Sequence, residues 1–296
     1  MPNYSEQIIA NWTNPASNTE EEKLSNAERM VREALTADDT LRQKSIEVFG
    51  QGSYANNTNV RLNSDIDINA CYKDGFYYDL PNEATREDYE ITPTEYTFSQ
   101  YKNDVERALV NKFGRDQVVR KNKCLRVLGN SYRTETDVVP TWEYRRYSQK
   151  SSYVTGVCFF SDEGKKITSY PKQHITNGRT KNTNTYRRFK SLVRIYKKVR
   201  YHMIDNGEIV NPAISSFLLE CLVWNVPNSI FTNNDSWTAR LRESIVYLYN
   251  QTKVQDTCKD WGEVSELLYL FYDGRKWTYQ DVNEHLVKMW NYIGYQ

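Results

Sequence analysis

Residues 52–69 read GSYANNTNVRLNSDIDIN, a Gly-Ser turn shortly before a strand that carries two acids. Side chains two positions apart on a strand point the same way, so Asp65 and Asp67 are expected to lie side by side. Two adjacent carboxylates repel unless a positive charge lies between them. A hard divalent cation such as Mg²⁺, which prefers oxygen ligands, supplies that charge. The spacing predicts a metal-binding strand, and two solvated acids on an exposed strand face are the alternative.

The turn Gly52-Ser53 ends a short β-prone run. Glycine lets the backbone approach a ligand closely. Backbone N–H groups at the start of a helix, together with a serine hydroxyl, can hold a phosphate. A Gly-Ser pair by itself is not specific, but next to the acidic strand it predicts a phosphate-binding turn beside a metal site.

A third acid, Asp137, lies in the stretch TETDVVP at residues 134–140, where Pro140 is expected to end a strand. Two metal ions about 4 Å apart, held by three carboxylates, can stabilise the attacking and the leaving oxygen of a phosphoryl transfer. Asp137 is therefore predicted to share a metal with the other two acids and to accept the proton of an attacking hydroxyl. Glu135 lies on the same strand face and is the rival for this role.

The hydrophobic periodicity separates the chain into two parts. Helical spacing occurs in residues 19–46 and 93–113. Alternating or β-branched runs predict strands at residues 46–49, 64–72, 118–128, 132–139, 153–160 and 166–170. Beyond about residue 180 the pattern is helical to the end. This order predicts an α+β fold, with a mixed-sheet core and its N-terminal helix in residues 1–178 and a helical domain in residues 179–296.

Composition excludes several classes of protein. The 296 residues include 39 Lys and Arg against 38 Asp and Glu, a net charge of +1, which argues against constitutive binding of duplex DNA. We find no signal-peptide pattern and no run of about 20 apolar residues, so we expect a cytoplasmic protein with no membrane partner. The five cysteines are widely spaced without a CxxC pair, which argues against a zinc cage or a disulfide framework.

Residues 179–200 contain nine Lys or Arg and no acid. From Tyr186 onward, apolar residues recur at helical spacing and predict one amphipathic helix. Like charges stacked on one helix face cost stability unless an anion compensates them. We therefore expect an anionic partner, such as a nucleoside triphosphate, because Lys and Arg pair strongly with phosphate. A solvated helix face is the alternative. The residues of this basic face are Arg187, Lys190, Arg194 and Lys197.

Taken together, the motifs Gly52-Ser53-Tyr54, Ser64-Asp65-Ile66-Asp67 and Asp137-Val138-Val139-Pro140 resemble the polymerase-β-type nucleotidyltransferases. Later stretches are similar, more narrowly, to the bacterial cGAS/DncV-like nucleotidyltransferases, or CD-NTases. The resemblance runs from about residue 45 to 226 and implies a polymerase-β-type core plus a C-terminal helical domain, two lobes with a central cleft. The later stretches are Lys181-Asn182, Phe189-Lys190, Val193-Arg194 and Ser216-Phe217-Leu218-Leu219-Glu220.

The resemblance also implies an activity. CD-NTases synthesise cyclic oligonucleotide signals in CBASS anti-phage defence, so the chain is expected to make a cyclic dinucleotide in the bacterial cytoplasm. Two nucleoside triphosphates (ATP, GTP or UTP) would react with two Mg²⁺ ions, for which Mn²⁺ can substitute. The diffusible product would reach an effector protein, and we expect a monomer. Base identity, ring size and linkage are not readable from the sequence.

Nucleotide-contacting residues are likewise implied by the resemblance. Lys190 is the first candidate for a triphosphate contact, and Arg194, Lys197 and Lys181 follow. Ser216 would touch phosphate. Phe217 would stack on a base, with a core position as the equal alternative.

Two other functions stay open. One is a polymerase-β-type enzyme with a different acceptor: an RNA end, a small molecule or a protein. The other is a nucleotide-binding sensor without catalysis, although all three acids are present.

Overall fold

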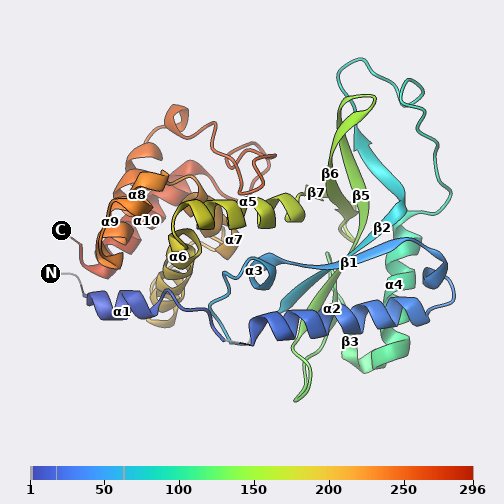
Figure 1. Cartoon of the computed structure of the whole chain (residues 1–296), viewed down its shortest axis with the longest axis horizontal. Coiled ribbons are helices and arrows are strands. Elements are labelled where there is room, and N and C mark those ends of the chain that lie inside the picture. Colours follow the sequence, from blue (N-terminus) through green and yellow to red (C-terminus); the bar gives the residue numbers. More distant parts are fainter. Residues whose placement is uncertain (1–2, 18, 63, 296) are drawn as a thin grey trace. The chain divides into compact units, whose positions relative to one another are not determined.

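The computed structural model describes residues 3–17, 19–62 and 64–295, and its packing divides the chain into two units (Figure 1). The sheet unit comprises Asn18–Ala55 and Asn63–Lys172. The helical unit comprises Met1–Ser17, Asn56–Leu62 and Gln173–Gln296. The main division therefore lies a few residues before the predicted position 178/179. In addition, two segments of the N-terminal half belong to the helical unit, which the periodicity does not indicate.

A seven-stranded sheet forms the sheet unit. Five strands follow the order β1-β2-β5-β4-β3, and in addition β6 pairs with β5 and β7 pairs with β6. β2 and β5 are parallel, and the other pairs are antiparallel. The strands are β1 (Ile46–Gln51), β2 (Ile66–Asp79), β3 (Val118–Arg120), β4 (Leu125–Val127), β5 (Thr136–Gln149), β6 (Ser152–Phe160) and β7 (Lys166–Ser169). The predicted hairpin at 153–170 is confirmed as β6 and β7.

Helices α2 (Glu20–Ala37) and α4 (Phe98–Phe113) pack against each other and against the sheet (Figure 1). Ile66 and Ile68 of β2 are fully buried in the core that these helices share with the sheet. Successive strand side chains alternate between faces, so Asp67 points to the face away from the two helices. The alternation predicted for this strand is thus confirmed. A one-turn helix α3 (Gly52–Ala55) and two 3₁₀ turns (Leu41–Gln43 and Arg115–Gln117) complete the unit.

Two strand boundaries differ from the prediction, because β2 continues to Asp79 and β5 continues past Pro140 to Gln149. Proline lacks an N–H donor and is expected to interrupt a ladder. On one side, however, β5 pairs with β4 as far as Val138 and with β6 from Trp142 onward. Pro140 lies in the gap between these pairings, where the strand loses no hydrogen bond, so the prediction that it ends the strand is wrong.

Two helices are shorter than their periodicity indicates, and side-chain caps explain both. α2 ends at Ala37, because the carboxylate of Asp38 accepts hydrogen bonds from the N–H groups of Thr40 and Leu41 and starts a new turn. α4 begins at Phe98, where Thr97 and Gln100 form a capping box.

In the helical unit, the predicted amphipathic helix is confirmed as α6 (Arg188–Asp205). Its apolar stripe is fully buried in one core with residues of α7, α9 and α10. Residues 258–278 contain no helix, so the pattern is not helical throughout. The other helices are α1 (Glu6–Asn11), α5 (Pro171–Asn184), α7 (Ser216–Trp224), α8 (Asn228–Thr232), α9 (Trp237–Gln251), the 3₁₀ turn Gln255–Thr257 and α10 (Tyr279–Ile293).

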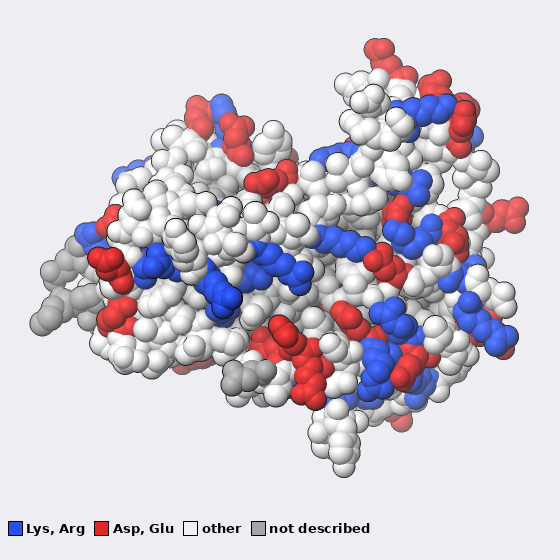
Figure 2. Space-filling model, in the orientation of Figure 1, with Lys and Arg blue, Asp and Glu red and all other residues white. Residues whose placement is uncertain are grey.

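The surface and the cysteines agree with the composition. On the face drawn in Figure 2, acidic and basic side chains both occur, in mixed groups and in short runs of one sign. All five cysteines are buried free thiols. Among the described residues, no helix has the length and apolar character that crossing a membrane requires.

Candidate active site

The strand register of the sheet unit brings the predicted acids together. β1 pairs Gln51 with Asp67, β2 pairs Asp67 with Asp137, and β4 pairs Arg126 with Asp137. These four residues form one row across four adjacent strands. Asp65 immediately precedes β2.

Arg126 joins three carboxylates at the end of this row. Its Nε and Nη2 donate to the two oxygens of Asp137, at 2.8 and 2.9 Å. Nη2 also donates to Oδ2 of Asp65 at 2.6 Å, and Nη1 lies 2.8 Å from Oε1 of Glu135. Asp65, Asp67, Glu135 and Asp137 are called the acid cluster below.

The acid cluster carries more negative charge than Arg126 balances. Burial raises the pKa of Asp67 to about 7, and the charges of Asp137 and Asp65 add to that effect. Burial also raises the pKa of Asp65, where Arg126 opposes and the charges of Asp137 and Glu135 reinforce the increase. A further cation would therefore bind favourably here.

Gly52 lies directly against the acid cluster. Its φ is +68°, and a Cβ at this position would stand 2.2 Å from Oδ2 of Asp67. Both the backbone angle and the space therefore require glycine. Ser53 follows in the one-turn helix α3, and the hydroxyl of Tyr54 donates to the carbonyl of Ser64, which ties the turn to the start of the acidic strand.

Lys190 of the basic face is buried, and burial lowers the pKa of its ammonium group while Glu220 opposes the shift. Its Nζ makes no hydrogen bond to any described residue, and only its backbone N–H is engaged, by Asn182.

Arg194 and Lys197 of the same face have internal partners within the helical unit. Arg194 donates to the carbonyls of Thr13 and Asn57. Lys197 donates to Oε2 of Glu220 at 2.8 Å and to the hydroxyl of Thr58 at 2.9 Å. Arg194 thus has two neutral carbonyl partners and Lys197 a charged one within the chain, so neither side chain needs an external anion to be hydrogen-bonded. Their contact with a nucleotide stays a prediction.

Lys181 is engaged at the carboxyl end of α7. Its Nζ donates to the carbonyls of Trp224 and Val226, at 2.6 and 2.8 Å. Burial lowers the pKa of this ammonium group to about 8. These contacts satisfy carbonyls that a helix leaves unpaired at its end, which favours a structural role for Lys181.

Ser216 and Phe217 are the first two residues of α7, which Ser215 caps. The Ser216 hydroxyl lies 3.2 Å from that of Tyr201. Phe217 is 39% exposed, which disfavours the core alternative. Its ring centroid lies 5.8 Å from that of His174.

Comparison with known proteins shows the family to which the chain belongs. The family description "cGAS/DncV-like nucleotidyltransferase C-terminal helical domain" matches residues 176–294. A cyclic dipyrimidine nucleotide synthase, CdnE of Cecembia lonarensis, is 61% identical over 293 residues, which are 99% of each chain. The chain belongs to the cGAS/DncV-like nucleotidyltransferases. A cyclic dipurine nucleotide synthase of Elizabethkingia meningoseptica is 44% identical and covers 99% of this nucleotidyltransferase and 100% of its own length.

Two solved structures agree with the fold of this nucleotidyltransferase. The structure of Elizabethkingia meningoseptica CdnE with GTP and Apcpp has a TM-score of 0.83 at 42% identity, over 99% of this chain and 100% of that one. The structure of Rhodothermus marinus CdnE with Apcpp and Upnpp has a TM-score of 0.86 at 27% identity, over 99% and 98%.

The donor set of the acid cluster fits a hard divalent cation, because all its side chains offer carboxylate oxygens. The described residues contain no group of three or more His, Cys, Asp or Glu side chains already arranged around a metal position. The guanidinium of Arg126 takes oxygens of Asp65, Glu135 and Asp137 instead.

Sequence reasoning missed Arg126 and the buried group around Glu220. Arg126 lies in the predicted strand 118–128, and the signal that could have identified it is the antiparallel pairing of this strand with the strand of Asp137. His174, whose Nε2 lies 3.0 Å from Oε1 of Glu220, and Thr58 gave no local signal.

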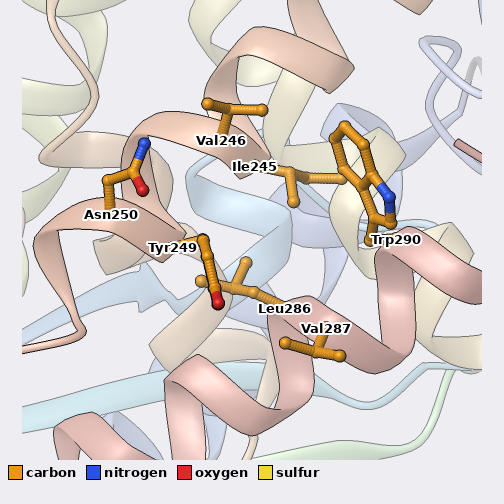
Figure 3. Close-up of a pocket in the computed structure, with 7 residues that line it drawn as sticks. All are labelled: Ile245, Val246, Tyr249, Asn250, Leu286, Val287 and Trp290. Carbon is orange, nitrogen blue, oxygen red and sulfur yellow. The ribbon is translucent and has the colours of Figure 1, made fainter. Parts of the chain in front are cut away.

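A pocket of about 380 Å³ between α9 and α10 is separate from this chemistry (Figure 3). Its lining contains no acidic or basic side chain: Ile245, Val246, Tyr249, Asn250, Leu286, Val287 and Trp290.

Proposed function

We propose that this nucleotidyltransferase joins two pyrimidine nucleoside triphosphates into a cyclic dinucleotide that serves as a signal in anti-phage defence. The observation that carries the activity is the row of acids across β2 and β5, with Gly52 against it. The pyrimidine assignment rests on the 61% identical relative, and a relative from Legionella pneumophila at 40% identity is also named a cyclic dipyrimidine nucleotide synthase. The 44% identical relative is named for purines, so base choice is the part most in need of a test.

Asp65, Asp67 and Asp137 would hold Mg²⁺, two ions by the number of carboxylates, with Mn²⁺ as a substitute. When bound, the metal supplies positive charge to the triphosphate and to the attacking hydroxyl. Asp137 would accept the proton of a ribose hydroxyl whose oxygen attacks the α-phosphorus of a nucleoside triphosphate, and the bond to pyrophosphate breaks. A second transfer of the same kind closes the ring.

Asp137 is assigned this role in preference to Glu135, because Asp137 stands in register with Asp67 while Glu135 precedes β5. Asp137→Asn should lose product formation by orders of magnitude, and Glu135→Gln should keep most of it.

Around the triphosphate, the backbone of the Gly52-Ser53 turn, which lies against Asp67, would contact phosphate oxygens, and the Ser53 hydroxyl would donate a hydrogen bond. Lys190 would contact the triphosphate, because its ammonium group has no hydrogen bond to a described residue. Ser216 would contact phosphate, and the partly exposed ring of Phe217 would stack on a base. We assign weaker roles to Arg194, Lys197 and Lys181, whose hydrogen bonds are already made.

The remaining assignments follow from this activity. The product would diffuse to an effector protein, and the enzyme would act in the bacterial cytoplasm as a monomer. The named relatives do not favour an RNA end, a small molecule or a protein as acceptor.

The test is product analysis. The purified protein is incubated with Mg²⁺ and all four α-³²P-labelled triphosphates, singly and in pairs, then treated with phosphatase and examined by mass spectrometry. A phosphatase-resistant cyclic product from UTP or CTP supports the proposal. A product made from purines alone would overturn the base assignment, and label on RNA or protein would overturn cyclisation.

A further inference from the structure

The guanidinium of Arg126 contacts three of the four carboxylates in the acid cluster. Two of its nitrogens chelate Asp137, and the same Nη2 also reaches Oδ2 of Asp65. Nη1 pairs with Glu135. A guanidinium presents five N–H groups in a fixed plane. Here all three of its nitrogens lie within 2.9 Å of a carboxylate oxygen.

The single positive charge of Arg126 does not balance the negative charges of the acid cluster. The acid cluster has four carboxylates, of which Arg126 contacts three, and Asp67 makes no ion pair with any described residue. Arg126 therefore holds Asp65, Glu135 and Asp137 together, and the acid cluster keeps a net negative charge.

The same oxygens are those that a divalent cation would need. Arg126 engages both oxygens of Asp137 and one of Asp65, which are two of the three proposed metal ligands. A metal ion at these ligands and a guanidinium within hydrogen-bond distance of them would repel each other strongly. The two cations therefore exclude one another.

We propose that Arg126 is an internal counterion of the acid cluster, which a divalent cation must displace in order to bind. This inference rests on the proposed function, because it takes Asp65, Asp67 and Asp137 as the metal ligands. Arg126 is thus a positioning residue, since it keeps the acids gathered before the metal arrives. Its side chain is 27% exposed, so the guanidinium can leave without opening the core. Because the divalent cation must displace the guanidinium of Arg126, this competition sets the metal concentration at which the site fills.

The test measures Mn²⁺ binding without nucleotide at pH 8, by the electron paramagnetic resonance signal of free Mn²⁺. Removing the competing charge in Arg126→Gln should tighten the Mn²⁺ dissociation constant about tenfold. The melting temperature in EDTA should fall, and Mn²⁺ should raise it by more than in the wild type.

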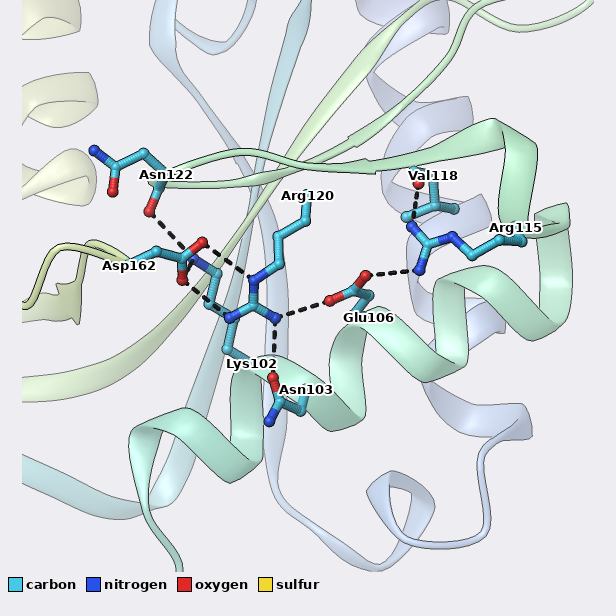
Figure 4. A network of polar contacts seen from close by, with 8 residues as sticks. All are labelled: Lys102, Asn103, Glu106, Arg115, Val118, Arg120, Asn122 and Asp162. Carbon is cyan, nitrogen blue, oxygen red and sulfur yellow. Dashed lines mark hydrogen bonds and ion pairs between the residues drawn. The ribbon is translucent and has the colours of Figure 1, made fainter.

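Arg120→Gln is the matched control. Arg120 lies on β3, which pairs with the strand of Arg126, β4. Its guanidinium also has several partners: Asp162, Glu106 and Asn103 (Figure 4). Its loss should lower the melting temperature while the Mn²⁺ dissociation constant stays at the wild-type value.

A second pair of variants covers the case in which Arg126→Gln does not fold. Glu135→Gln/Arg126→Gln removes one charge of each sign, and Glu135→Gln alone is its reference. The double variant should again bind Mn²⁺ about tenfold more tightly than its reference.

The outcomes separate the two claims. Equal or weaker Mn²⁺ binding after loss of Arg126, in a protein whose binding still depends on Asp65 and Asp67, would overturn the counterion role and leave the metal site intact. If wild type and Asp65→Asn/Asp67→Asn bound Mn²⁺ equally, the metal site itself would be wrong and the counterion role with it.

Discussion

The acid cluster and the basic face of α6 are two runs of like charge that the protein balances in different ways. In the acid cluster, three of the four carboxylates share the guanidinium of Arg126, and Asp67 makes no ion pair with a described residue. On α6, Arg194 donates to two carbonyls, and Lys197 is paired with the buried Glu220.

The carboxylate of Glu220 shows that the positive charge of Lys197 on α6 is balanced inside the protein. Burial alone would favour its neutral form, yet the charge of Lys197 and the hydrogen bond from His174 hold its pKa well below the ordinary value. At Asp67 burial and like charges act in the same direction, and the pKa rises to about 7. A run of charge therefore indicates a ligand site only where the fold leaves it uncompensated, which is the case for the acid cluster and, on α6, for Lys190.

The largest expected effect concerns the uncompensated region. Asp65→Asn/Asp67→Asn should lower the rate of product formation by about 1000-fold or more, because metal ligation supplies several kcal/mol of transition-state stabilisation. Activity is measured with labelled triphosphates, and a thermal melt in EDTA serves as the folding control. If the folded variant kept a tenth of the wild-type rate, these acids would not be the metal ligands.

The next largest effect is a loss of stability, and it concerns the buried ion pair of Lys197 and Glu220. Lys197→Met leaves Glu220 without its buried cation and should cost about 3–5 kcal/mol of unfolding free energy. Urea denaturation checks this value. The double variant Lys197→Met/Glu220→Gln should recover much of the loss, and a loss equally large in the double variant would show that the ion pair is not the cause.

Lys190 differs from Arg194 and Lys197 on α6, because its ammonium group has no hydrogen bond to a described residue. Lys190→Met should lower kcat/KM for nucleotide by about 10- to 150-fold, the equivalent of one charge-assisted hydrogen bond of 1.5–3 kcal/mol. The unfolding free energy should not fall, because no hydrogen bond of Nζ to a described residue is lost. Lys276→Met, at an exposed position of the same unit, is the matched control. Equal kinetics for the two variants would remove Lys190 from the site.

The smallest expected effect is a gain in unfolding free energy, whereas the change at Lys197 is expected to lower it. Burial raises the folded-state pKa of Asp67 from its ordinary value of 3.8 to about 7, so the folded protein binds this proton more tightly than the unfolded chain. Stability of the metal-free protein is therefore lost as the pH rises from about 4 to about 7. Asp67→Asn should raise the unfolding free energy in EDTA by about 1–2 kcal/mol at pH 8, and by less at pH 5.5. A variant less stable than the wild type at pH 8 would show that the charge of Asp67 is compensated after all.

Local patterns in the sequence determined a good part of this protein. The alternation around Asp65–Asp67 encodes a strand with one buried and one acidic face, because neighbouring strand side chains point to opposite sides. The apolar stripe after Tyr186 encodes a helix with one buried face. Gly52 next to a serine encodes a tight turn, and the structure adds its reason, the contact that a Cβ would make with Asp67.

Tertiary structure alone decided which charges meet. Arg126 meets Asp137 across β4 and β5, which are close in the chain. It also reaches Asp65 because β2, far away in the sequence, pairs with the other side of β5, and no local period encodes that pairing. Lys197 finds Glu220 because α6 and α7 pack in one core. Pro140 remains within a strand because the neighbours of β5 change at that point. Local spacing fixes the direction of a side chain relative to its own backbone, but compensation of its charge depends on the segments that pack against it.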